Sequence, residues 1–280
     1  MVKRTPDGPP PPPAVQKLRL RYSKRGRLRF TSHRDIARAF ERALRRAQVP
    51  MAYSAGFSPH PKISWVGAAP TGVASEAEYV EISLAVRVDP DVLRVALDAS
   101  LPDGIDIVEV VEAPPGTSLP ERIQASHWEV RLVEVSLERA QRAVAAFLAA
   151  PEVLVQRLVK DGFRTLDARA ATVSVAVCAT EGEPGCVILQ MVLRHVTPAV
   201  RPDDVLSGLR LVADLEPPVP PAATRVRQGP LTETGEVDDP LTPDRAAGRP
   251  AVAAQPGATR QAVGPERATV GAEAPAATHP

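Results

Sequence analysis

Apolar and charged positions alternate strictly near the start of the chain. Leu18 and Leu20 alternate with basic residues, and the alternation resumes after Gly26 and ends at Phe30. A period of two predicts a half-buried strand along this whole segment, with a turn or a bulge at the glycine. We expect its polar side to present a row of arginines.

A helical pattern follows directly. Ser32 is a candidate N-cap, with Asp35 three residues later in the position of a capping box. Apolar residues between 36 and 47 recur at the spacing of one helix face, and we expect the helix to end before Pro50. The opposite face is basic and carries Arg34, Arg38, Arg42 and Arg45, with Arg46 beside them.

The rest of the pattern mixes strands with helices. We expect strands over 63–67, 78–88, 105–111, 127–135, 153–159, 172–177 and 187–193, and helices over 89–100, 136–150 and 201–211. From residue 17 to 112 the predicted order is β-α-β-β-α-β, which is typical of the ferredoxin-like fold. The following hundred residues repeat much of that order. The expected fold is therefore α+β, with two tandem ferredoxin-like units and antiparallel sheets.

Composition predicts where the folded part begins and ends. Many of the 31 prolines lie near the two ends of the 280-residue chain, and the last aromatic residue is Phe163. Segments rich in proline, alanine and charge bury too little apolar surface to offset the entropy of ordering. We expect a disordered leader (1–14), two domains (15–115 and 116–215) and a disordered tail (216–280).

Several classes of protein are excluded by simple counts. No run of 18 apolar residues occurs, which argues against a membrane-spanning helix. The first residues lack the apolar stretch of a secretory signal. The chain has two cysteines, too few for a disulfide framework. We therefore expect a cytoplasmic protein that has no membrane partner.

The formal net charge of +1 conceals a strong asymmetry. Residues 1–62 contain 15 Lys/Arg and three Asp/Glu, whereas residues 63–130 contain 12 Asp/Glu and three arginines. A basic block of this kind suggests an anionic partner, either RNA or an acidic protein surface. The alternative is that the basic block pairs with the acidic block inside the fold.

Two motifs carry a resemblance to a known family. They are Phe-Thr-Ser-His-Arg-Asp at residues 30–35 and Gly-Phe-Ser-Pro-His-Pro-Lys at residues 56–62. With them the chain resembles, over about residues 17–211, the radical-SAM-linked protein family, a bacterial domain of unknown function. Members are encoded beside a radical SAM enzyme or fused to it. The resemblance implies such an enzyme as a partner.

The chain itself lacks the residues for radical SAM chemistry. That chemistry needs three closely spaced cysteines to hold an iron–sulfur cluster, and only Cys178 and Cys186 are present. We therefore expect a non-catalytic accessory subunit, with no cofactor in this chain, that binds RNA or presents a substrate.

The candidate binding surface combines the first predicted helix with the segments on either side of it. Helix N-termini attract anions, and rows of arginine bind phosphates. The candidate residues are Arg27, Arg29, Ser32, His33, Arg34, Arg38, Arg42, Arg45, Arg46, Tyr53, His60 and Lys62.

Other functions remain open for the same residues. The surface could dock an acidic protein without binding RNA, a reading that the scarcity of aromatic residues favours. His33 could act as the general base of a metal-independent ribonuclease. A metal site formed by His33, Asp35 and His60 is a weaker possibility, because their spacing matches no known zinc signature. Glu76, Glu78 and Glu81, which form a further cluster, are expected to be solvated or paired with arginines.

Overall fold

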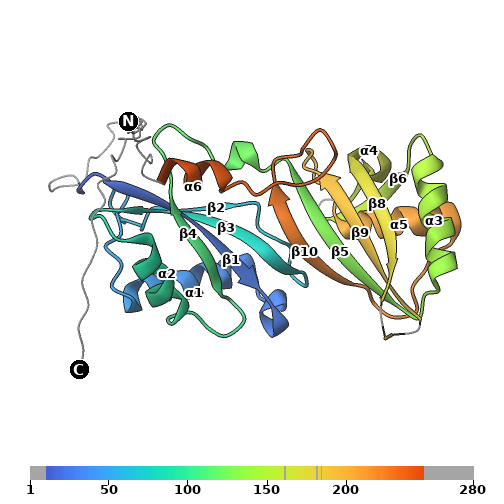
Figure 1. Ribbon diagram of the computed structural model, residues 1–280, viewed down its shortest axis with the longest axis horizontal. Coiled ribbons are helices and arrows are strands. Elements are labelled where there is room, and N and C mark those ends of the chain that lie inside the picture. Colours follow the sequence, from blue (N-terminus) through green and yellow to red (C-terminus); the bar gives the residue numbers. More distant parts are fainter. Residues whose placement is uncertain (1–10, 161, 181, 184, 249–280) are drawn as a thin grey trace, which may run out of the picture. The chain divides into compact units, whose positions relative to one another are not determined.

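An eight-stranded, mostly antiparallel sheet runs through the computed structural model, and six α-helices accompany it (Figure 1). The structure describes residues 11–160, 162–180, 182–183 and 185–248. The strand order is β4-β1-β3-β10-β5-β9-β8, and β2 pairs with β3 beside this path. The mixed α+β class predicted from the sequence is confirmed. Within the described ranges, no helix is both long and apolar enough to cross a bilayer.

The first half of the sheet contains four strands in the order β4-β1-β3-β2, all antiparallel to their neighbours. In chain order its elements are β1 (Gln16–Lys24), the 3-10 helix η1 (Gly26–Phe30), α1 (His33–Arg46), β2 (Ile63–Val66), β3 (Ala74–Leu84), α2 (Pro90–Asp98) and β4 (Ile107–Glu112).

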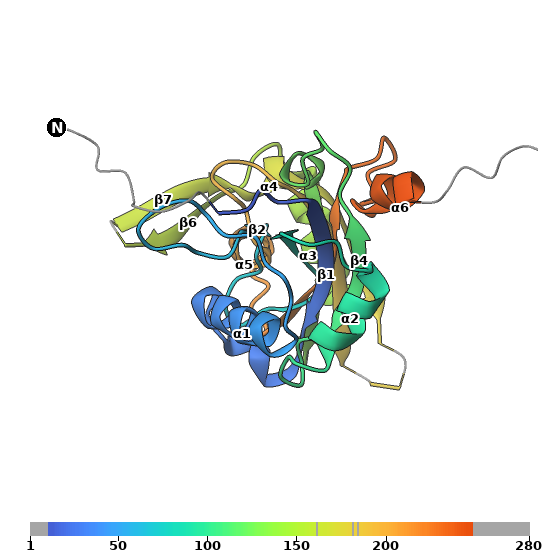
Figure 2. The same ribbon diagram turned by 90° about the vertical axis from the view of Figure 1, so that its left-hand side faces the viewer.

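The apolar positions of β1 fix how this half packs. Leu18 lies opposite Ile82 and Leu20 opposite Val80 in the β1–β3 register. These side chains are fully buried against the apolar faces of α1 and α2, which lie on the same side of the strands (Figure 2). Phe40 of α1 is fully buried in that core. The alternation of the sequence therefore gives the predicted strand and its predicted buried side.

The second half repeats the same order of strands, β10-β5-β9-β8, again antiparallel. After β4 the chain continues, in order, with η2 (Pro120–Arg122), β5 (Ala125–Val133), α3 (Leu137–Ala149), β6 (Leu154–Val159), β7 (Gly162–Asp167), α4 (Ala168–Ala171), β8 (Thr172–Ala179), β9 (Cys186–Arg194), α5 (Pro202–Ala213), β10 (Ala222–Gly229) and α6 (Thr242–Gly248). The last of these, α6, returns to the first half and packs on β4.

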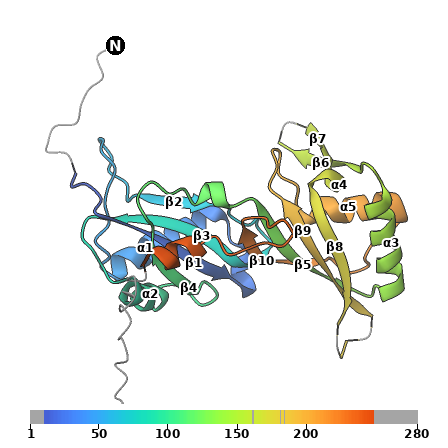
Figure 3. The same ribbon diagram turned by 45° about the horizontal axis from the view of Figure 1, so that its top comes forward.

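Helices α3 and α5 cover one face of this half. Val130 and Leu189, which face each other across β5 and β9, are buried with Phe147 of α3 and Leu209 of α5. The predicted strand over 153–159 lies outside the large sheet. It forms the two-stranded hairpin β6–β7, which lies close to α4 and α5 (Figure 3).

The expected disordered tail is wrong for residues 222–248. Strand β10 pairs in parallel with β3, where Thr224 lies opposite Ala74, and antiparallel with β5, where Arg225 lies opposite Trp128. The two halves are thereby joined in one sheet. The pairing of β10 and the buried contacts of α6 stabilise these residues enough to offset the entropy lost on ordering them. Composition alone does not show such long-range contacts. Residues 249–280 of the expected tail, and residues 1–10 of the expected leader, lie outside the described residues.

The expected continuation of the first strand to Phe30 is also wrong. Strand β1 ends at Lys24, and Gly26, with a φ of 56°, starts the 3-10 helix η1. Glycine adopts this left-handed φ without strain, so the backbone leaves the extended conformation at Gly26. The predicted turn or bulge at this glycine is therefore the point after which the strand does not continue.

Candidate nucleic-acid interface

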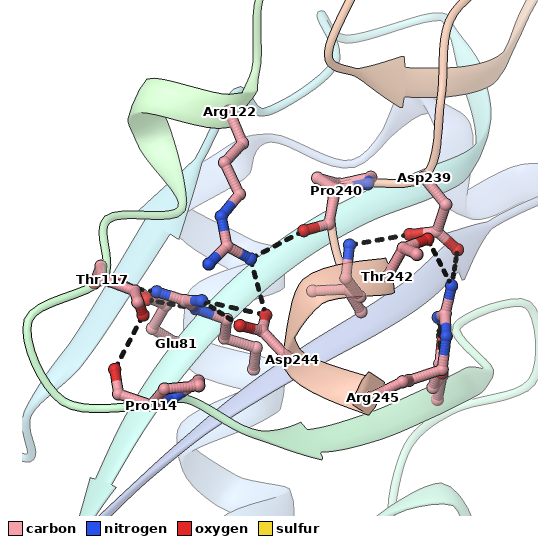
Figure 4. A network of polar contacts seen from close by, with 12 residues as sticks. Glu81, Pro114, Thr117, Arg122, Asp239, Pro240, Thr242, Asp244 and Arg245 are labelled. Atoms are coloured by element: carbon pink, nitrogen blue, oxygen red, sulfur yellow. Dashed lines mark hydrogen bonds and ion pairs between the residues drawn. The ribbon is translucent and has the colours of Figure 1, made fainter. Parts of the chain in front are cut away.

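Arg19, in the middle of β1, is buried rather than presented outward. Its side chain is 0% exposed, and its Nη1 donates hydrogen bonds of 2.7 and 2.9 Å to the two carboxylate oxygens of Asp244. Its Nε donates to Glu81 at 2.9 Å, and its Nη2 donates to the carbonyl of Thr117 at 2.9 Å. Arg122 donates to the same Asp244 carboxylate at 2.9 Å (Figure 4). We call these five residues the Arg19 network.

Other cations of β1 are paired as well. The ammonium of Lys17 lies 3.7 Å from a carboxylate oxygen of Glu81, and Nη1 of Arg21 lies 3.8 Å from a carboxylate oxygen of Asp239. Arg25, just after the strand, pairs with Glu76 and with Asp106. The expected outward row of arginines is therefore wrong for Arg19, which is buried, and Arg21 is only partly exposed and lies near a carboxylate. Their partners come from the acidic block of residues 63–130 and from the C-terminal segment, which supplies Asp239 and Asp244.

A second buried ionic group lies where the two halves meet. Glu78 pairs with Arg225 of β10, whose guanidinium lies 5.5 Å from the centroid of the Trp128 ring. Burial by itself would raise the pKa of Glu78, but Arg225 and hydrogen bonds from Ser75 and the Ala69 amide lower it below its ordinary value. Together with the pairs made by Glu76 and Glu81, this makes the carboxylate cluster a set of arginine-paired groups.

Helix α1 begins as its sequence predicts. The Ser32 hydroxyl accepts a hydrogen bond of 3.2 Å from the Asp35 amide and donates one of 2.7 Å to the Asp35 carboxylate. Ile36, Phe40 and Leu44 are buried on its inner face. The outer face is left to the arginines.

The arginines of α1 remain exposed, in contrast to those of β1. Arg38 lies 3.5 Å from Asp35 and Arg45 lies 3.7 Å from Glu41, both at the surface. Arg46 donates to the carbonyl of Ser100 at 3.3 Å. Over the part of the chain that the structure describes, Arg34 and Arg42 have no carboxylate within 4.0 Å. Helix α1 is therefore the place where the basic charge faces solvent.

The loop between α1 and β2 lies beside the C-terminal half of this helix. The backbones of Tyr53 and Pro61 form an isolated antiparallel β-bridge, and the Ser54 amide donates a hydrogen bond of 2.9 Å to the His60 carbonyl. These two contacts close the loop on itself. Arg45, Tyr53 and His60 line one cavity of about 150 Å³. The structure thus brings together three of the candidate residues from separate segments. Lys62 also is exposed, on the same loop.

His33 lies elsewhere on α1. Its ring packs edge-on against Trp65 of β2, with 5.1 Å between the ring centroids. The cavity that contains His60 does not include it. Among the described residues, no group of three or more His, Cys, Asp or Glu side chains is arranged to hold a metal. The structure therefore does not bring His33, Asp35 and His60 together as a group that could hold a metal.

Exposed aromatic rings lie in the segments that flank α1. Phe30, just before the helix, is 60% exposed, and Phe57, in the loop after it, is 70% exposed. The Arg29 guanidinium lies 4.6 Å from the centroid of the Phe30 ring. Arg27 is exposed on η1 beside them. We define the α1 basic surface as Arg27, Arg29, Phe30, residues 53–62 and the five exposed arginines of α1, namely Arg34, Arg38, Arg42, Arg45 and Arg46.

The sequence analysis missed a group of polar residues in and after β10. Arg227, Gln228 and Asp238 line a cavity of about 600 Å³ on the sheet. The composition of residues 216–280, rich in proline, alanine and charge, predicts disorder for them instead. The alternation of Thr224 and Val226 with arginines is the signal that could have identified the strand.

Comparisons with known proteins place the chain in a family but give it no activity. No curated protein matches it. A solved structure titled "Crystal Structure of a Cbf5-Nop10-Gar1 Complex" shares 13% identity, with a TM-score of 0.40; the similarity covers 82% of this chain and 56% of that chain. An encapsulated DyP-type peroxidase from Mycobacterium smegmatis shares 11% identity, with a TM-score of 0.17, over 79% of this chain and 94% of that one. Residues 17–202 match the family described as "Uncharacterized protein conserved in bacteria (DUF2344)", and the chain belongs to that family.

Proposed function

We propose that this protein binds RNA through the α1 basic surface and has no catalytic role of its own. The observation that carries the proposal is the contrast between two sets of arginines. Arg19 of β1 is buried and paired, whereas the arginines of α1 face solvent, and among the described residues Arg34 and Arg42 have no carboxylate within 4.0 Å. Unpaired cations on one helix face repel one another, and a phosphate backbone relieves that repulsion.

The aromatic rings favour RNA over an acidic protein as the anionic partner. Proteins that bind single strands combine a basic surface with aromatic side chains on which bases stack. The Phe30 and Phe57 side chains are more than half exposed, and neither belongs to a buried hydrophobic cluster of the described residues.

The resemblance to radical-SAM-linked proteins suggests the setting of this binding. We place the chain as an accessory subunit that holds RNA, or another anionic substrate, for a radical SAM enzyme. The two free cysteines lie in β8 and β9. The test is an anaerobic pull-down with the tagged full chain from the native organism. A co-purified iron–sulfur protein of the radical SAM class supports the pairing, and its absence from repeated pull-downs contradicts it.

The tandem ferredoxin-like description fits this proposal. Each half of the sheet has the strand order fourth-first-third-second, with antiparallel neighbours, when β6 and β7 are treated as an insertion. Helices α1 and α2 in one half correspond to α3 and α5 in the other. Duplication of one unit would explain why only the first half carries the basic helix, since the copies are free to diverge.

The direct test reverses two charges on α1. We expect Arg38→Glu combined with Arg42→Glu to weaken binding of a fluorescein-labelled single-stranded RNA by about tenfold or more in anisotropy titrations. Neither side chain lies in the core, so the melting temperature should hardly change. The matched control is Arg142→Glu with Arg210→Glu, which alters two exposed arginines of α3 and α5.

Each outcome of that test decides something. Loss of RNA binding in the α1 variant alone supports the proposal. Equal loss in both double variants means that general charge, and not this surface, carries the binding. Absence of RNA binding by the unmodified protein at low salt, with capture of the partner enzyme intact, means that the surface docks protein instead.

A further inference from the structure

A small cavity lies within the α1 basic surface, between the C-terminal half of α1 and the loop that follows it. Its volume is about 150 Å³, and Glu41, Leu44, Met51 and Tyr53 are among the residues that line it. Pockets for drug-sized ligands hold roughly 300–1,000 Å³. A cavity well below that range has room for one planar ring system and not for a whole nucleotide.

The inner wall of this cavity is apolar. Leu44 of α1 and Met51 of the loop line it and are only 2% and 9% exposed, and Pro59 and Pro61 line it as well. Tyr53 lines the same cavity and is 41% exposed, so its aromatic ring is within reach of a ligand. Proteins that recognise single-stranded RNA stack unpaired bases on such rings. The wall and the ring together suit the flat, apolar faces of a base.

Glu41 adds a free carboxylate to the cavity. Among the described residues, the one cation within 4.0 Å of it is Arg45, whose Nη2 lies 3.7 Å from Oε2. That distance is too long for a hydrogen bond, so Arg45 leaves the carboxylate oxygens free to accept. Asp35, the other acidic residue of α1, is instead engaged with Ser32 at the start of the helix. A carboxylate on a basic helix repels phosphates, but it can accept hydrogen bonds from the edge of a base.

The carboxylate determines which base fits best. An ionised carboxylate has two oxygens that only accept hydrogen bonds. Guanine presents two adjacent donors on its Watson–Crick edge, the N1–H and the 2-amino group. Adenine, cytosine and uracil each place an acceptor beside their donor on that edge, and this acceptor would face a carboxylate oxygen. The cavity therefore favours guanine over the other three bases.

We propose that this cavity receives one unpaired guanine base of a bound RNA strand. The apolar wall and the Tyr53 ring contact the faces of the base, and Glu41 accepts hydrogen bonds from its N1–H and its 2-amino group. Arg45, exposed beside Glu41, is suited to contact an adjacent phosphate. This inference rests on the RNA-binding function proposed above and adds base specificity to it.

The test compares short single strands that differ in one base. An all-uridine strand and strands with one central guanosine, inosine, adenosine or cytidine are titrated against the full chain by fluorescence anisotropy. We expect the guanosine strand to bind about fivefold or more tightly than the adenosine, cytidine and all-uridine strands. Inosine lacks the 2-amino group, so its strand should bind more weakly than the guanosine strand.

Glu41→Gln should remove the preference for guanosine, because a side-chain amide offers only one accepting oxygen. The preference is a ratio of affinities for one variant, so a general change in RNA binding does not affect it. The matched control is Glu138→Gln on α3, whose carboxylate also has an arginine four residues later, and it should keep the preference.

The contrary results separate this inference from the function on which it rests. Equal affinities for all the strands would overturn the guanine site and leave the RNA-binding proposal intact. A Glu41→Gln variant that retains the preference, or an inosine strand that binds as tightly as the guanosine strand, would show that Glu41 does not recognise the base. Absence of binding by every strand at low salt would overturn both proposals.

Discussion

Replacement of Asp244 is the sharpest test of how the C-terminal segment is held to the fold. Its carboxylate is fully buried and accepts hydrogen bonds from Arg19 and Arg122. Asp244→Ala leaves the Arg19 guanidinium, also fully buried, with Glu81 as its one remaining carboxylate partner. Removing one member of a buried ion pair costs roughly 3–5 kcal/mol, because the other charge stays out of water without compensation.

The expected loss is large enough to measure in two ways. For a folded unit of this size, roughly 3–5 kcal/mol lowers the melting temperature by about 6–20 °C. Urea titrations followed by circular dichroism should give the same loss of unfolding free energy, with an unchanged dependence on urea concentration. The control is Glu138→Ala, which removes a carboxylate that is 79% exposed and should change stability by less than about 0.5 kcal/mol.

A small effect would refute the reasoning. If Asp244→Ala loses less than about 1 kcal/mol, the cost expected of an uncompensated buried arginine is absent. The C-terminal helix would then not be bound to β1 through this carboxylate. A loss equal to that of the Glu138 control would have the same meaning.

Three further results are expected. A chain that ends at Leu215 should fail to fold cooperatively because it lacks β10, whereas a chain that ends at Gly248 should unfold in one transition. If both chains unfold cooperatively at the same temperature, β10 is dispensable. Because Glu78 has a pKa below its ordinary 4.5 when folded, its contribution to stability is present above pH 4.5 and is lost as the pH falls through the folded value. Glu78→Gln should therefore flatten this acid dependence in urea titrations. His33→Ala should leave the lengths of bound RNA unchanged on gels; wild-type cleavage that the variant loses would mean that the protein is a ribonuclease.

The sequence predicts the local elements better than their partners. Helix α1 begins at its predicted cap, and the helices that start at Pro90 and Pro202 lie where the proline and aspartate pattern places them. These features depend on hydrogen bonds between residues a few positions apart. Patterns of this range are visible in a single sequence.

Long-range pairing accounts for what the sequence could not show. Whether an arginine on a strand faces solvent depends on what covers that side of the sheet, and Arg19 is covered by a helix more than 200 residues away. The same holds for β10, whose pairing with β3 is a contact between remote segments. Arginines on α1 stay exposed because no other segment of the described chain covers them.

Crosslinking is the measurement that tests the central claim most directly. Ultraviolet irradiation of the full chain with a uridine-rich single-stranded RNA, followed by peptide mass spectrometry, identifies the residues that touch bases. The account predicts crosslinks at Phe30, Tyr53 or Phe57. It also predicts a binding affinity that falls with salt with a log–log slope of about −3.5, as expected for about five phosphate contacts. Crosslinks confined to the second half of the sheet, or an affinity independent of salt, would contradict it.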